Sequence, residues 1–279
     1  MYFQGLTNGG TLGALGKSFR FSQTALSTFH TCRRRFWLRY VRRVQWPAML
    51  TEQMAGWERA IERGSLFHRW IHQESVGIDL VDSVRKEEDA VLQRWWENWC
   101  NTPPALPEGT VYSEIQLSAP ILSHRLVAQF DRLIVTESGR MHIADWKTGL
   151  KAPIQSVFEA SWQTRVYLYV AVEAGRIFVP KVLVNPSDVV LSYWHANAPS
   201  ALRAIPYSAD EHERARSIIE QSVAEICALP DEIEAFSKCE DRVECTRCVY
   251  AVLCDRGCAS VDAWESDTAN AVEEIEDPW

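Results

Sequence analysis

A carboxylate and an ammonium group stand two residues apart in this chain, at Asp145 and Lys147. They belong to a run of apolar and small residues, 141–147, that predicts a short β-strand. Because residues i and i+2 of a strand face the same way, the two side chains should project side by side, and Trp146 should be buried on the opposite face. A carboxylate can hold a divalent cation and a nearby ammonium can orient a water, so the pair suits metal-assisted phosphodiester hydrolysis.

A second acid lies upstream, on a segment that predicts an adjacent strand. Residues 125–135 are rich in β-forming side chains, and a polar turn containing Gly139 separates them from the strand that follows. Such a hairpin would bring Asp131 beside Asp145 and would offer a cation two carboxylates. The alternative is that Asp131 forms an ion pair with a neighbouring arginine at a sheet edge.

Two predicted helices carry further polar groups. His68 lies in a helical pattern over residues 55–74, and its imidazole could complete a metal site of oxygen and nitrogen ligands. Taken singly, such a histidine is more often an ordinary surface or core residue. Gln163 and Tyr167 are four residues apart in the predicted helix 158–173, so they share one face and could bind a phosphate or a base edge. An ordinary polar helix face is the alternative for that pair.

In their order along the chain, these residues resemble the RecB-like branch of the PD-(D/E)XK nuclease superfamily. That branch carries a helix His, a strand Asp, an Asp/Glu-x-Lys and a Gln-x-x-x-Tyr; the matching residues are His68, Asp131, Asp145, Lys147, Gln163 and Tyr167. The segment 21–36 is similar to the first motif of the branch, and Glu114 lies where relatives often place an acid on the preceding strand. The resemblance covers about residues 20–255. One departure is residues 128–130 (Ala-Gln-Phe), where relatives usually have a glycine shortly before the metal-binding Asp.

The resemblance implies a metal-dependent deoxyribonuclease with an α/β restriction-endonuclease-like core, a central mixed sheet flanked by helices. It assigns Mg²⁺ or Mn²⁺ to His68, Asp131 and Asp145 with the Trp146 carbonyl as a further ligand, the attacking water to Lys147, the DNA strand to Gln163 and Tyr167, and a weaker supporting contact to Glu114. Relatives typically degrade single strands, so we expect an exonuclease that acts on single-stranded DNA ends. The alternative is a non-catalytic DNA-binding or scaffold subunit of a nuclease or adaptation complex, although the intact acids and lysine argue against it.

Two biological roles follow from the same resemblance. One is DNA repair or recombination beside a helicase, and the other is CRISPR spacer acquisition beside an integrase. The chain has no Gly-x-x-x-x-Gly-Lys-Ser/Thr phosphate loop, so it is no helicase by itself. The sequence leaves the two roles open.

The eight cysteines indicate a metal rather than disulfides. No basic and apolar leader of a secretory signal stands near the N-terminus, so we expect a reducing cytoplasm, where clustered thiols usually bind metal. The cluster is Cys245-x-x-Cys248 followed by Cys254, and its spacing alone favours a zinc site completed by Cys258 or Cys239. Two others, Cys100 and Cys227, stand in apolar helical surroundings and are expected to fill the core.

Iron–sulfur members of the RecB-like branch suggest a different ligand set. They include the AddB helicase–nuclease subunit and a CRISPR-associated nuclease, and they take one cysteine from the N-terminal motif and three from a C-terminal cluster. Cys32 with Cys245, Cys248 and Cys254 is similar to that pattern. The resemblance therefore implies a structural [4Fe–4S] cluster that joins the two ends of the chain, with structural zinc as the alternative.

The formal net charge of −8 is unevenly distributed. Residues 261–279 carry seven acids and no Lys or Arg, and we expect this tail to be disordered or to bind a partner. Residues 17–43 carry eight bases and no acid, and Arg33, Arg34 and Arg35 on a helix over 22–44 could follow a DNA backbone. A solvated amphipathic helix is the alternative.

The element pattern predicts helices around a central sheet. We expect helices at 55–76, 82–100, 158–173 and 209–229, and strands at 111–119, 124–135, 141–147 and 187–195. The expected organisation is a tag remnant and flexible start (1–16), an N-terminal basic helix with the first cluster cysteine (17–50), a nuclease core (51–235), a Cys-rich region (236–260) and the acidic tail (261–279). No apolar run is long enough to span a bilayer.

Overall fold

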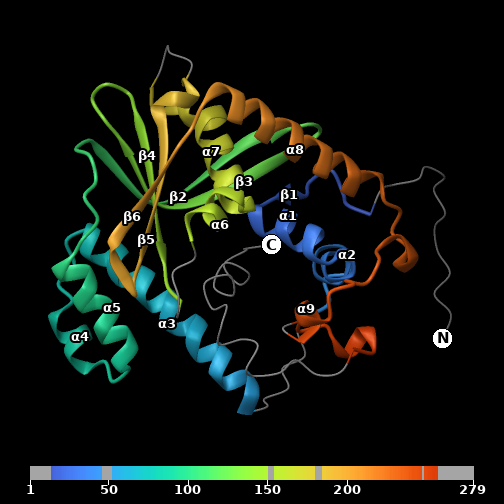
Figure 1. The fold of residues 1–279 in the computed structure, drawn as a ribbon, viewed down its shortest axis with the longest axis horizontal. Coiled ribbons are helices and arrows are strands. Elements are labelled where there is room, and N and C mark those ends of the chain that lie inside the picture. Colours follow the sequence, from blue (N-terminus) through green and yellow to red (C-terminus); the bar gives the residue numbers. More distant parts are fainter. Residues whose placement is uncertain (1–13, 46–51, 150–153, 180–183, 247, 257–279) are drawn as a thin grey trace.

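A six-stranded mixed β-sheet with helices packed around it forms the centre of the protein (Figure 1). The computed structural model describes residues 14–45, 52–149, 154–179, 184–246 and 248–256. The strands are β1 (Arg20–Phe21), β2 (Thr110–Ile121), β3 (His124–Val135), β4 (Met141–Lys147), β5 (Val189–His195) and β6 (Ala198–Pro206). The helices are α1 (Gln23–Thr31), α2 (Arg33–Phe36), α3 (Glu52–Ser75), α4 (Val81–Lys86), α5 (Ala90–Asn101), α6 (Gln155–Ala160), α7 (Trp162–Ala174), α8 (Ala209–Ala228) and α9 (Arg242–Thr246). The predicted fold class is confirmed.

Strand β3 has three neighbours, and its pairing creates a gap in the sheet. Strand β2 pairs with β3 antiparallel along its length. The other edge of β3 pairs with β4 over residues 132–135 and with β1 over residues 125–126. Strand β4 pairs in parallel with β5, which pairs antiparallel with β6. Strands β3 and β4 therefore separate soon after their hairpin, at the level of Asp131 and Asp145.

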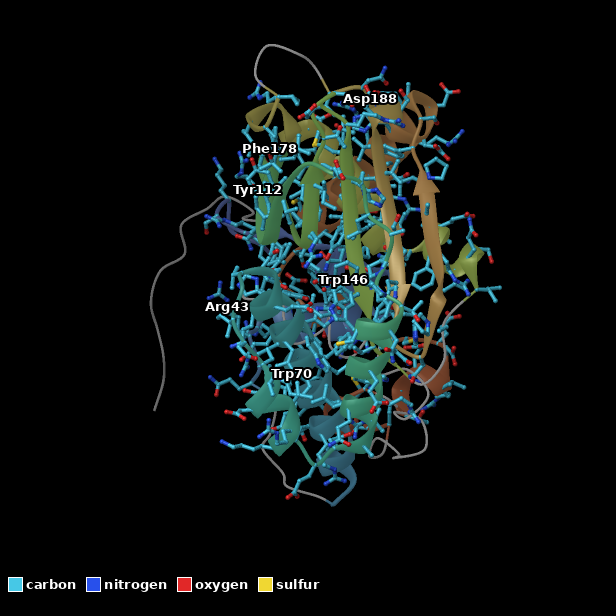
Figure 2. All side chains as sticks on the ribbon, turned by 90° about the vertical axis from the view of Figure 1, so that its left-hand side faces the viewer. Arg43, Trp70, Tyr112, Trp146, Phe178 and Asp188 are labelled. Carbon is cyan, nitrogen blue, oxygen red and sulfur yellow. The ribbon has the colours of Figure 1, made fainter. Side chains whose placement is uncertain are left out.

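Side chains of the sheet alternate between two hydrophobic cores. The larger core lies against α1, α7 and α8 and includes Ile143 of β4. The smaller core lies against α3 and α5 and is rich in tryptophan, with Trp70 of α3 and Trp146 of β4 among its members (Figure 2). Trp146 is 2% exposed, and its ring meets that of Trp99 edge-on at 4.9 Å. Trp146 thus points away from its two charged neighbours, as predicted.

Polar residues set the starts of the principal helices. Ser22 accepts a hydrogen bond from the Ala25 amide at 3.1 Å and begins α1. Asp89, Ser161 and Ser208 cap α5, α7 and α8 in the same way. These caps fix the first turn of each helix, and the cap of α7 places its first residues next to β4.

The N-terminal helix is broken, so the prediction of one continuous helix over residues 22–44 is wrong. Helix α1 ends at Thr31, Cys32 is extended (φ −157°, ψ 106°), and α2 begins at Arg33. The Cys32 thiol caps α2 by accepting from the Arg35 amide at 3.4 Å. A π-helical turn, Trp37–Val41, follows α2. The break turns the chain, and α2 lies beside the C-terminal segment that contains α9 (Figure 1).

The remaining differences from the predicted elements are small. The predicted helices 82–100 and 158–173 are each two helices, α4 with α5 and α6 with α7, and strands β1 and β6 were not predicted. The expected tag remnant and the acidic tail lie outside the described residues. No helix in the described part of the chain combines the length and hydropathy needed to cross a bilayer.

Candidate active site

At the gap between β3 and β4, a side-chain hydrogen bond replaces the backbone hydrogen bonds that would otherwise join the two strands. Asp131 precedes the paired stretch 132–135, and its Oδ2 accepts a hydrogen bond from the Trp146 backbone N–H at 2.6 Å. The carboxylate therefore takes over a backbone donor of β4 that would otherwise be left without a partner at the gap. This contact brings Asp131 next to the segment that carries Asp145 and Lys147.

Helix α3 supplies the imidazole that was predicted for the site. His68 Nδ1 donates to Asp131 Oδ1 at 3.2 Å, and both side chains are largely buried. Burial by itself raises the pKa of the Asp131 carboxyl, but His68, the Trp146 N–H and the Lys147 ammonium together outweigh burial, so the pKa lies below its ordinary value. Asp131 is thus held as a carboxylate, the form that binds a cation.

Glu114 of β2 completes a three-residue group with His68 and Asp131. One ligand atom from each lies within 4.8 Å of the other two. Glu114 has a left-handed backbone (φ 51°), which is unfavourable for a residue other than glycine. Its Oε2 also accepts from Gln129 Nε2 at 3.1 Å. The two carboxylates and one imidazole form a donor set suited to Mg²⁺ or Mn²⁺.

Asp145 and Lys147 form the second half of the site, on the face of the sheet that α7 covers. Lys147 Nζ lies 3.1 Å from Asp145 Oδ2, so the predicted side-by-side arrangement is present. Gln163, in the first turn of α7, donates from Nε2 to Asp145 Oδ1 at 3.0 Å. All three residues are buried. Because the Lys147 ammonium is buried, its position is set by the neighbouring Asp145 carboxylate rather than by solvent.

Two further residues border Lys147 and were not predicted from the sequence. In the parallel pairing of β4 with β5, Tyr193 lies opposite Asp145, and His195 lies opposite Lys147. The Lys147 ammonium is 5.5 Å from the centre of the Tyr193 ring, and the Tyr193 hydroxyl is 2.8 Å from Thr164 Oγ1. The alternating pattern of residues 189–195 could have indicated their face, but not their register with β4.

Comparison with protein families matches residues 20–255 to the PD-(D/E)XK nuclease superfamily. The chain belongs to this superfamily. The matched range includes every residue of the site described above, and the α/β fold agrees with the assignment.

Comparisons with individual proteins add only distant similarities. No curated protein matches this nuclease-superfamily member. Among solved structures, SSO0001 is 15% identical, with 86% of this chain and 87% of that chain covered and a TM-score of 0.42. A proposed exonuclease from Eubacterium rectale is 10% identical, with 80% of this chain and 86% of that chain covered and a TM-score of 0.40.

The predicted DNA-contacting residues of this superfamily member have other contacts in the structure. Tyr167 is buried, and its ring packs on Phe130 at 5.0 Å. Arg33 forms an ion pair with Glu225, while Arg34 donates to backbone carbonyl groups of residues 233 and 236. Contacts of these residues with DNA stay predictions.

Five cysteines line one pocket between α2 and the C-terminal segment of the described chain. The residues that line it are Cys32, Arg35, Lys238, Cys239, Glu244, Cys245, Cys248, Tyr250, Ala251, Cys254 and Arg256. Burial raises the pKa of the Cys248 thiol to about 11, so a buried thiolate there needs a compensating cation. The structure brings together Cys32 and the C-terminal cysteines, which are more than two hundred residues away in the sequence, while Cys258 lies outside the described residues.

The two remaining cysteines differ from each other. Cys227 is half-buried on α8, with its Sγ 3.8 Å from His124 Nδ1. Cys100 is exposed, so the prediction that it fills the core is wrong. On α5 the buried positions are Leu92, Trp95 and Trp99, and Cys100 is turned away from them by about 100° because it follows Trp99 directly.

Proposed function

We propose that this protein is a divalent-metal-dependent deoxyribonuclease that degrades single-stranded DNA from an end. The observation that carries the proposal is the continuous network at the gap between β3 and β4. It runs from His68 to Asp131, and through the Trp146 N–H to the pair of Asp145 and Lys147. A purely structural ion pair would not need an imidazole, two acids and a buried lysine in one place. In a member of a nuclease superfamily, this combination supports a catalytic site.

We assign the metal ligands to His68, Asp131 and Glu114, whose donor atoms already lie close together, with Asp145 as a further ligand. When bound there, Mg²⁺ or Mn²⁺ supplies Lewis-acid activation of the phosphate and lowers the pKa of a bound water. The backbone carbonyl of Trp146, between Asp145 and Lys147 on β4, is a further candidate ligand. The left-handed backbone of Glu114 supports its assignment, because strain of this kind is retained where a side chain must be aimed.

Lys147 has the role of orienting the attacking water and offsetting charge on the phosphate. Its ammonium is held between the Asp145 carboxylate and the Tyr193 ring, so its position is fixed before DNA binds. Gln163 in turn holds the other oxygen of Asp145. This preorganisation is what electrostatic stabilisation of a transition state requires.

The direct test is Lys147→Ala, measured by Mn²⁺-dependent degradation of single-stranded DNA labelled at the 5′ or the 3′ end. We expect the rate to fall by roughly 100-fold or more, because a positioned lysine contributes on that scale. Lys86→Ala, an exposed lysine on α4, is the matched control and should keep full activity. Mononucleotide release from one labelled end would identify an exonuclease. Full activity of Lys147→Ala would overturn the assignment.

We also propose that Cys32, Cys245, Cys248 and Cys254 hold a [4Fe–4S] cluster. The proposal is supported by the single pocket that Cys32 shares with the three C-terminal cysteines, the split ligand set of the iron–sulfur relatives. An anaerobically purified sample should be brown and contain about four iron atoms per chain. A colourless protein with one equivalent of zinc would overturn this proposal.

For the biological role we propose the processing of DNA ends, either in repair and recombination beside a helicase or in CRISPR spacer acquisition beside an integrase. Both roles require a nuclease that acts on single-stranded ends. The genes next to this one discriminate the two, because a helicase partner and an integrase partner are encoded by different neighbours.

A further inference from the structure

A stack of aromatic and cationic side chains lies beside the candidate active site, at the start of α7. The imidazole of His30, the penultimate residue of α1, stacks on the indole of Trp162 with ring centroids 4.8 Å apart and planes 21° apart. The guanidinium of Arg165 lies 4.8 Å from the centre of the same indole. None of these three residues belongs to the network of His68, Asp131, Asp145 and Lys147.

The stack is connected directly to that network. Trp162 is the residue before Gln163, whose amide holds Asp145. Adjacent Cα atoms are about 3.8 Å apart, so the Cα atom of Trp162 lies next to that of Gln163. The backbone of Trp162 therefore lies close to the residue that holds Asp145.

His30 is fixed in place yet remains exposed. The Ser222 hydroxyl donates to the Ile218 carbonyl, so Ser222 Oγ accepts from His30 Nε2, at 2.9 Å. Burial lowers the pKa of His30, Glu225 raises it, and the Arg33 and Arg165 guanidinium groups lower it again, with a net shift below the ordinary value. The imidazole is therefore mainly neutral near pH 7, and two cations lie close to it.

A second stack, between α7 and α8, shows how a purely structural one differs. Tyr169 and His212 stack with centroids 5.2 Å apart and planes 11° apart, but His212 is only 5% exposed and lies within a buried polar network. His30 is instead exposed to solvent. Its partner Trp162 is partly buried and packs against the larger hydrophobic core.

We propose that His30, Trp162 and Arg165 form a base-stacking platform for the single strand that enters the active site. Exposed aromatic faces and guanidinium planes bind unpaired bases of any sequence, and nearby cations attract the backbone. In a duplex the base faces are covered by neighbouring pairs, so the platform discriminates in favour of single strands. This inference rests on the proposed nuclease function and adds the group that selects its substrate.

The test measures the affinity of short fluorescent single-stranded oligonucleotides in a Lys147→Ala background, where the strand is not degraded. His30→Ala should weaken binding by roughly tenfold, which corresponds to the loss of one stacked base. His30→Phe keeps a flat ring and should retain most of the affinity. Tyr112→Ala removes an aromatic ring that pairs with Phe178, beyond the other end of α7, and should leave affinity unchanged. Affinity for a blunt duplex should be the same in all variants.

A scan of single abasic sites along the oligonucleotide makes the test independent of how well each variant folds. One abasic position should weaken binding to the Lys147→Ala protein and have no further effect on the His30→Ala variant. If His30→Ala binds as tightly as the reference and no abasic position weakens binding, the platform is overturned even though Lys147-dependent cleavage persists. A protein that binds no single-stranded DNA overturns both the platform and the nuclease proposal.

Discussion

Glu114 shows how one strained residue can complete a site. Its left-handed backbone places a carboxylate within 4.8 Å of donor atoms of His68 and Asp131. We expect Glu114→Gln to keep the side-chain shape but to lose the charge that attracts the cation. The Mn²⁺ concentration for half-maximal cleavage should rise about tenfold, while Glu137→Gln in an exposed turn should change nothing. An unchanged Mn²⁺ titration for Glu114→Gln would remove this residue from the proposed metal site.

We expect Gln163 to act through Asp145 rather than on the substrate. Its amide donates to Asp145 Oδ1, and both side chains are buried. Gln163→Leu should therefore lower kcat by roughly 10- to 100-fold, the usual effect of losing the partner that orients a metal-binding carboxylate. The matched control is Gln155→Leu on α6, where the exposed glutamine donates to Glu159. If Gln163→Leu raised the KM for DNA and left kcat intact, Gln163 would bind the strand directly.

Sequence spacing predicted the part of the site that is local. Asp145 and Lys147 share a face because a strand alternates, and their ion pair follows from two residues of separation. The approach of Glu114 could not be predicted in the same way, because it depends on a left-handed φ that a glutamate rarely adopts. Tyr193 and His195 were missed because their place beside Lys147 depends on the register of two strands that are more than forty residues apart.

At the scale of elements, the hydrophobic pattern predicted the long helices and four of the six strands. It failed where tertiary contacts decide the local conformation. Cys32 interrupts the N-terminal helix with an extended backbone and uses its thiol as the cap of α2. Nothing in the helical periodicity of this segment signals that break. Strand β1 is only two residues long and exists through its pairing with residues 125–126 of β3.

The tryptophan-rich core behind β4 supports the strand that carries Asp145 and Lys147, the proposed catalytic pair. Trp146 packs edge-on against Trp99, and Arg132 lies over its ring at 5.4 Å. Trp146→Ala should lower the free energy of unfolding by about 3–5 kcal/mol because it leaves a large cavity. Trp146→Phe should cost less, and so should Trp96→Ala, since Trp96 is only half-buried. Urea denaturation of the three variants gives the order, and equal losses for Trp146→Ala and Trp96→Ala would contradict it.

At the scale of the whole molecule, the two ends of the described chain are joined by contacts that do not involve the thiols. Arg34 donates to the carbonyl groups of residues 236 and 233 at 2.8 and 2.9 Å. The Tyr250 hydroxyl donates to the Val44 carbonyl at 3.1 Å, and Phe36 stacks on Phe236. The nuclease fold is thus closed by a protein clasp as well as by the proposed cluster. Both close the same loop of about two hundred residues.

Two connections that close one loop should not act independently. Once one is formed, the second gains little further loop entropy, so the loss of either is partly masked by the other. Arg34→Ala should cost about 1 kcal/mol of unfolding free energy while the thiol site is intact, because its hydrogen bonds are only partly buried. In a Cys32→Ala background the same change should cost clearly more and should expose residues 236–256 to rapid proteolysis. Arg85→Ala, which removes an exposed ion pair on α4, serves as the control in both backgrounds. Equal costs of Arg34→Ala in the two backgrounds would show that the clasp and the thiol site stabilise separate parts of the chain.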